Sequence, residues 1–172
     1  MIMPRGQQLL MPVRPGFIAL SVAITFILSL LPLGGLAWMP DLLMVVLAFW
    51  AMHHPQRLGM GVAFALGLCM DVQQTSMLGQ HALAYVLVVY VAHRSSRRMM
   101  WFSPLMQALQ MLPVFAAVHL VQVLIRMAAG NMFPGLSIAL APLLEAALWP
   151  LISAALLAPQ RRAPDSDDNR PL

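Results

Sequence analysis

Apolar residues occur in six long stretches of this sequence, separated by short segments that contain arginine, aspartate, proline or glycine. Long apolar stretches predict membrane-spanning helices, because the backbone of such a segment satisfies its own hydrogen bonds in lipid. We place the helices at residues 16–36, 38–52, 58–71, 78–92, 102–125 and 136–158. The pattern therefore predicts an all-α integral membrane protein, a compact bundle of about six transmembrane helices.

The second and third predicted helices are short. A perpendicular span needs about 20 residues, so these helices are either partly re-entrant or shielded at their ends by neighbouring helices. We expect a single membrane domain over residues 1–158, followed by a disordered cytoplasmic tail over residues 159–172, where the sequence becomes polar and rich in aspartate and proline.

Composition supports the membrane assignment. Of the 172 residues, 60% are hydrophobic and 9% are charged, whereas a soluble domain carries about 25% charged residues. All ten basic residues are arginines, in short clusters between the apolar stretches, and with six acidic residues they give a net charge of +4. Such clusters indicate membrane orientation and argue against nucleic-acid binding. The single cysteine, Cys69, cannot form a disulfide within the chain.

The arginines predict the orientation of the bundle, because arginine near short loops collects on the cytoplasmic side. With six spans, one side receives nine of the ten arginines, and the other receives Asp41, Asp71 and Arg126. Both termini are then cytoplasmic. The alternative, a cleaved signal peptide over the first apolar stretch, would leave five spans and move the arginine clusters to the wrong side. The nine are Arg5, Arg14, Arg57, Arg94, Arg97, Arg98, Arg161, Arg162 and Arg170.

The third predicted helix carries small residues on one face. Gly59, Ala63, Gly67 and Asp71 recur every four residues, and such faces allow helix backbones to approach closely in lipid. The face contacts either another helix of this chain or a partner protein. Asp71 either accepts hydrogen bonds from backbone N–H groups of the segment that opens the next helix, including Gly79, or contacts a partner.

A second set of polar side chains is expected near the middle of the membrane. Glu145 lies deep in the last predicted helix, where a lone charge is costly, while His119, Gln122 and Arg126 share one face of the fifth. We predict a hydrogen bond between Glu145 and His119, with Gln122 and Arg126 extending this intramembrane polar seam outward.

Tryptophans lie at several predicted span ends. Trp38, Trp50 and Trp101 are expected to anchor the bundle at the headgroup layer. Trp149 lies deeper, so we expect it to pack against another helix or a partner.

The sequence contains no Gly-rich phosphate loop, no metal-binding spacing and no nucleophile motif. We therefore predict a protein that is not an enzyme and uses no cofactor or metal. Two functions remain: a scaffold that contacts another membrane protein, and a small-molecule-binding subunit of a transporter. The second would need convergent polar groups around a cavity, and few polar residues lie within the spans.

An ordered series of residues between Met39 and Val91 resembles the MreD family of bacterial rod shape-determining membrane proteins. The Leu148-Trp149-Pro150 triplet is a further, weaker likeness, and length and span number also agree. The series is Pro40, Trp50, Pro55, Arg57, Gly61, Phe64, Gly67, Asp71, Leu78, Gly79, Ala82 and Tyr90.

This resemblance implies a non-catalytic, multi-pass component of the bacterial inner membrane that belongs to the cell-elongation complex and is needed for side-wall peptidoglycan synthesis. The expected direct partner is the bitopic protein MreC. Through it the protein would link MreB filaments to RodA and its penicillin-binding transpeptidase. The family also looks similar to the substrate-binding subunits of energy-coupling-factor transporters, which is the source of the transporter alternative.

Overall fold

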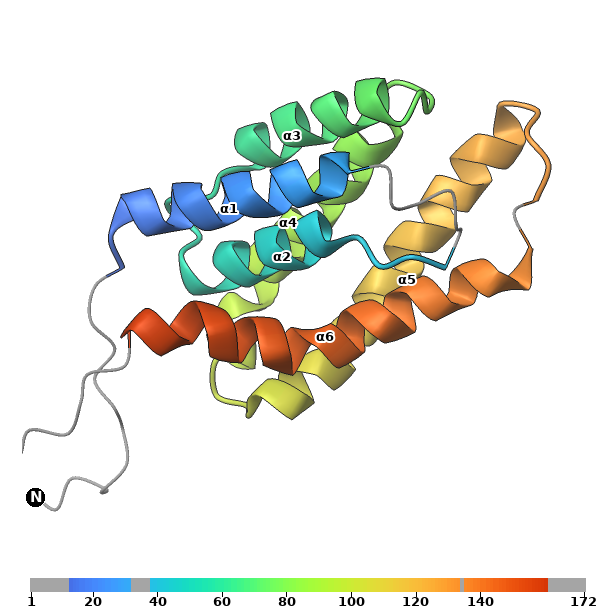
Figure 1. The fold of residues 1–172 in the computed structure, drawn as a ribbon. Coiled ribbons are helices and arrows are strands. Elements are labelled where there is room, and N and C mark those ends of the chain that lie inside the picture. The colour runs from blue at the N-terminus through green and yellow to red at the C-terminus, as the bar shows by residue number, and fades with distance from the viewer. Residues whose placement is uncertain (1–12, 32–37, 134, 161–172) are drawn as a thin grey trace, which may run out of the picture.

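The computed structural model describes residues 13–31, 38–133 and 135–160 of the chain. Within these ranges the chain forms six α-helices and no strand (Figure 1). Short 3₁₀ helices precede and follow the last of them, at Leu136–Ala139 and Ala158–Gln160. The α-helices are α1 (Pro15–Leu30), α2 (Leu42–His53), α3 (Met60–Gln73), α4 (Gln80–Met99), α5 (Pro104–Ala128) and α6 (Leu140–Leu157).

The all-helical prediction is confirmed, and two helical segments are long and apolar enough to cross a membrane. These are α5 and the segment Leu136–Gln160, which contains α6, each of 25 residues. Their lengths correspond to about 37 Å, more than the hydrocarbon core of about 30 Å. Parts of two predictions, the end of the first helix (residues 32–36) and most of the C-terminal tail, lie outside the described residues.

The boundary of α4 corrects one prediction. Arg94, Arg97 and Arg98 were expected in a loop after residue 92, but they belong to the last two turns of α4. Hydropathy falls where the arginines begin, whereas the backbone remains helical because arginine is a good helix former and favours a helix C-terminus. The arginines are therefore held on one rigid element.

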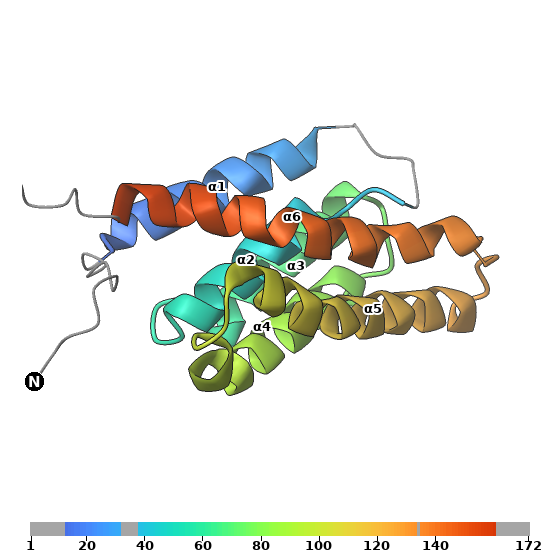
Figure 2. The same ribbon diagram turned by 90° about the horizontal axis from the view of Figure 1, so that it is seen from below.

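The second helix forms the centre of the molecule. All ten residues from Leu43 to Met52 are buried, because α1, α4 and α6 pack around the helix (Figures 1 and 2). Its 12 residues span about 18 Å, so α2 is a short apolar helix shielded by its neighbours. The helix begins at Leu42, later than predicted, because the Asp41 carboxylate caps it by accepting a hydrogen bond from the backbone N–H of Met44 (3.1 Å).

Charged residues separate to opposite ends of this bundle. One end of the bundle, at the left of Figure 1, is where α1 begins and where α2 and α4 end. We call it the arginine end, because Arg14 precedes α1, Arg57 follows α2, and Arg94, Arg97 and Arg98 belong to the end of α4. There the Arg57 side chain donates to the carbonyl of Val13 (3.2 Å), which joins the loop after α2 to the segment before α1. The start of α1 and the end of α6 both lie at this end.

All three acidic residues of the described ranges lie toward the other end, which we call the carboxylate end. Asp41 lies at the start of α2, Asp71 lies near the end of α3, and Glu145 bonds to the backbone of Asp41.

The tryptophans only partly follow expectation. Trp101 is 90% exposed in the turn between α4 and α5, as expected of an interfacial residue. The prediction for Trp50 is wrong: it is fully buried and donates to the Ser21 hydroxyl of α1 (2.9 Å). Trp149 is also fully buried. It packs against other helices of this chain, since it donates to the Gln107 side chain of α5 (3.2 Å) and contacts Phe49 of α2.

Candidate functional site

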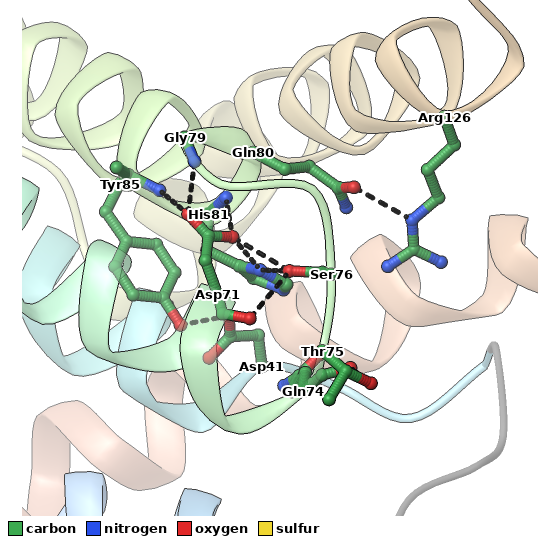
Figure 3. Close-up of polar contacts among 11 residues, drawn as sticks. Asp41, Asp71, Gln74, Thr75, Ser76, Gly79, Gln80, His81, Tyr85 and Arg126 are labelled. Atoms are coloured by element: carbon green, nitrogen blue, oxygen red, sulfur yellow. Dashed lines mark hydrogen bonds and ion pairs between the residues drawn. The ribbon is translucent and has the colours of Figure 1, made fainter. Parts of the chain in front are cut away.

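Asp71 joins the end of α3 to the beginning of α4 (Figure 3). Its Oδ2 accepts hydrogen bonds from the backbone N–H groups of Gly79 (2.8 Å) and Ala82 (3.4 Å), and its Oδ1 accepts from the backbone N–H of His81 (2.8 Å). The His81 ring Nδ1 and the Ser76 hydroxyl also lie within 2.9 Å of Oδ1. The carboxylate thus caps α4 from another helix, where the positive end of the helix dipole favours a negative charge.

A close approach of the two helices brings Asp71 into position. A Cβ atom added to Gly67 would lie 2.3 Å from the Cα of Ala82, so the two backbones touch there. Gly79 precedes α4 with φ of +97°, a left-handed conformation that favours glycine. Both glycines are therefore required by the geometry that lets the carboxylate reach the N–H groups of α4.

Most of the small-residue face of α3 lies against another helix of this chain. Ala63, Gly67 and Asp71 are buried inside this chain, and Gly67 and Asp71 contact α4. Gly59 lies just before α3, is exposed, and has open space around its Cα. The contact is therefore internal, and Gly59 takes no part in it.

A second cluster of buried polar side chains surrounds Glu145 of α6. Its Oε1 lies 2.8 Å from the His119 ring Nε2 of α5 and accepts a hydrogen bond from the backbone N–H of Asp41 (3.0 Å). The predicted contact between Glu145 and His119 is therefore present. Glu145 is fully buried, and its bond to Asp41 ties α6 to the start of α2.

Tyr85 of α4 connects the cluster around Asp71 with the cluster around Glu145. Its hydroxyl donates to Asp41 Oδ2 (2.7 Å), and its ring lies edge-on to His81, with 6.1 Å between ring centroids. Hydrogen bonds, together with the ring contact between His81 and Tyr85, therefore connect Asp71 through Asp41 to Glu145. We call the set of Asp41, Asp71, His81, Tyr85, His119 and Glu145 the polar core. It joins α3, α4, α5, α6 and the start of α2.

The outer part of the predicted seam differs from expectation. Arg126 does not continue from Glu145; its side chain donates to Gln80 Oε1 at the start of α4 (3.2 Å; Figure 3). Gln122 is buried on α5. Arg126 thus links the end of α5 to the start of α4. The sequence pattern of α5 alone could not indicate that these two helix ends lie close together.

The chemistry of the polar core is that of a clamp between helices. Most of its polar atoms bond to each other or accept hydrogen bonds from backbone N–H groups at the starts of α2 and α4. Within the described part of the chain, no three His, Cys, Asp or Glu side chains lie close enough together to hold a metal ion.

Sequence reasoning missed Tyr85, His81, Gln80 and Gln107 as members of polar contacts. Tyr85 and His81 are four residues apart on α4, so they share a face, and this spacing was the available signal. Asp41 was noted only as a charge, although an aspartate directly before an apolar stretch is typical of a helix N-cap.

Replacement of Glu145 tests the clamp. Glu145→Leu removes the acceptor for the Asp41 N–H and the partner of His119, so we expect a loss of about 1–3 kcal/mol in unfolding free energy. Glu145→Gln retains one oxygen that can accept both bonds, and Oε2 has no partner among the described residues, so a smaller loss is expected. Unfolding of both variants in detergent micelles measures the difference. Equal losses would contradict this role of Oε1.

Comparison with known proteins agrees with the sequence resemblance. The sequence pattern of the family described as rod shape-determining protein MreD matches residues 12–158. The chain is 30% identical over 105 residues to the rod shape-determining protein MreD of Haemophilus influenzae. This match covers 58% of the chain and 65% of the relative, so it spans just under two thirds of the relative's length.

No solved structure matches the chain, and the expected likeness to energy-coupling-factor subunits stays a prediction. The family match covers most of the chain, from before α1 to the end of α6. The protein belongs to the MreD family of rod shape-determining membrane proteins.

Proposed function

We propose that this protein is a non-catalytic scaffold of the bacterial inner membrane that binds MreC within the cell-elongation complex. Through MreC it links MreB filaments to RodA and its penicillin-binding transpeptidase, and so supports side-wall peptidoglycan synthesis. The family membership supports the role in rod shape. The polar core bonds within this chain. The observation that carries the partner-binding role is therefore the exposed row of small residues on α3, which is Gly61, Ala65 and Cys69.

The separation of charge supports a multi-pass arrangement with six spans and both termini in the cytoplasm. Five arginines gather at the arginine end, while the carboxylates and Arg126 lie toward the other. The positive-inside rule then assigns the arginine end to the cytoplasm. Helices α2 and α3 are shorter than the membrane is thick, and α2 is accommodated because longer helices surround it.

The outward face of α3 is the surface that we propose for MreC. The face toward α4 is closed, but Gly61, Ala65 and Cys69 recur every four residues on the opposite, exposed side. A Cβ on Gly61 would meet open space. Small residues at this spacing allow a partner helix to approach the α3 backbone, and the exposed side chains of Val62 and Phe64 lie beside them.

Cross-linking through Cys69 tests this surface, because it is the only cysteine of the chain. MreC variants with single cysteines along their transmembrane helix are coexpressed with the wild-type chain, and membranes are oxidised. We expect disulfides at MreC positions spaced three or four residues apart, since a disulfide needs Cβ atoms about 4 Å apart.

A matched control moves the cysteine to α6. Leu151 is 67% exposed, so Cys69→Ser combined with Leu151→Cys presents a thiol on another outward face. This variant should give no regular pattern. Disulfides from position 151 together with none from Cys69 would place MreC elsewhere and overturn the proposed surface.

The polar core gives little support to the transporter alternative. A small-molecule site needs convergent polar groups that are free to bind. In the described ranges, the Tyr85 hydroxyl instead donates to Asp41, and His119 contacts Glu145. Asp41 and Asp71 also cap the starts of α2 and α4.

A further inference from the structure

A groove runs between α4 and α5 on the arginine side of the molecule. Its wider part is an open cavity of about 560 Å³ beside the last turns of α4. A second cavity of about 310 Å³ continues from it toward the middle of the bundle. The two share Pro113 and Val114 as lining residues, so they form one continuous groove.

The wide part of the groove is basic. Arg94 and Arg98 line it from α4, four residues apart and therefore on the same face, with Ser95 beside them and Gln110 opposite on α5. None of its lining residues carries a carboxylate, and the three acidic residues of the described ranges lie toward the carboxylate end. The charge of this part is therefore complementary to an anion.

The narrow part of the groove is apolar. Leu87 and Val91 line it from α4, and Ala117 and Val121 line it from α5. The lining of the groove thus changes along its length from a basic part with two guanidinium groups to a part with only apolar side chains. A ligand that fits it has an anionic head and an apolar tail.

Pro113 lines both parts of the groove. It lies inside α5, where its ring cannot donate a hydrogen bond to the carbonyl of Leu109 and crowds the preceding turn. Leu109, Gln110 and Pro113 all line the wide part of the groove. The disturbed turn of α5 therefore faces the arginines of α4.

The depth of the groove matches one leaflet of a bilayer. From Arg98 to Leu87 the α4 axis rises about 16 Å, and half of the hydrocarbon core is about 15 Å. Trp101, 90% exposed, lies just beyond the basic part, at the level where aromatic rings meet headgroups.

We propose that this groove binds an anionic phospholipid of the cytoplasmic leaflet, such as phosphatidylglycerol. The phosphate lies between the guanidinium groups of Arg94 and Arg98, and an acyl chain follows the apolar part past Val91 and Ala117. Basic pockets between transmembrane helices bind anionic headgroups in this way. This site is separate from the polar core and from the outward face of α3.

Native mass spectrometry of the full-length protein in neutral detergent tests the site. Phosphatidylglycerol and phosphatidylcholine with identical acyl chains are added separately, and retained lipid is counted. We expect the wild type to bind phosphatidylglycerol at least about tenfold more tightly, since each arginine near a headgroup contributes about fivefold. Arg94→Ala combined with Arg98→Ala should abolish this preference.

Two matched controls separate the groove from general charge and surface effects. Arg97 lies on the same turns of α4 but does not line the groove, so Arg97→Ala should retain the preference. Ala117→Phe fills the apolar part and should weaken binding of phosphatidylglycerol at least about fivefold without a change of charge, because each displaced methylene loses about 0.8 kcal/mol of burial. Ala116→Phe, outside the groove, should not weaken it.

Three results would overturn the proposal. The wild type could bind both lipids equally, or Arg97→Ala could lower binding as much as the double variant. Alternatively, Ala117→Phe could leave phosphatidylglycerol binding unchanged while abolishing capture of MreC, which would make the groove a helix-docking surface. Ala117→Phe keeps the test open if the double arginine variant does not fold.

Discussion

Gly67→Leu is expected to prevent α3 from packing on α4. A Cβ at this position would lie 2.3 Å from Ala82 Cα and 2.5 Å from its backbone nitrogen, and backbone atoms cannot move aside as a flexible side chain can. Overpacking of a tight site costs about 1–3 kcal/mol or more, and here separation of the helices also removes the Asp71 contacts. We expect loss of more than about 3 kcal/mol in unfolding free energy, measured by thermal unfolding in detergent micelles.

Gly61→Leu is the matched control on the same helix. Its Cβ meets nothing within 4 Å, and Gly61 lies on the outward face, so the purified variant should unfold at the wild-type temperature. If Gly67→Leu and Gly61→Leu unfold alike, the close contact between α3 and α4 does not hold the bundle together.

Asp71→Ala is expected to destabilise the start of α4. The substitution leaves the buried N–H group of His81 and the half-buried one of Gly79 without their acceptor, and it removes a negative charge from the helix N-terminus. We expect a loss of about 2–4 kcal/mol in unfolding free energy. Faster amide hydrogen exchange over residues 79–83 than over the end of α4 would locate the effect.

Asp71→Asn is the control for charge and shape. Asparagine retains one oxygen and can still accept from one or two N–H groups, so an intermediate loss is expected. Because Asp71 is fully buried, weaker capture of MreC by Asp71→Ala should be matched by its loss of stability. Lost capture with unchanged stability would contradict the internal role and indicate direct contact with a partner.

The fold class followed from the sequence because lipid leaves few choices for a long apolar segment. Helix α5 illustrates this: its hydropathy alone predicted a helix over 102–125, and the structure has Pro104–Ala128. The end of α4 was missed because hydropathy locates apolar residues, while Arg94, Arg97 and Arg98 continue the helix beyond them.

The polar core was only partly predictable. Glu145 and His119 were paired by depth, which needs only counting along two helices. The contacts of Tyr85 with Asp41 and of Arg126 with Gln80 depend on how α4 crosses its neighbours, and no spacing within one helix carries that information.

Four residues of the family resemblance lie at one contact between helices. Gly67, Asp71, Gly79 and Ala82 all meet where α3 approaches α4. The motif therefore describes how this bundle is closed. For the proposed contact with MreC this leaves other surfaces, of which we propose the outward face of α3.

Capture of MreC from membranes tests the scaffold function most directly. The tagged full-length chain, as wild type and as Gly61→Leu, is coexpressed with MreC and purified in mild detergent at matched expression. The wild type should retain MreC, and Gly61→Leu should lose most of it while unfolding at the same temperature, because leucine separates a partner helix from α3. If the wild type retains no MreC and instead carries a small molecule through purification, the scaffold account is wrong.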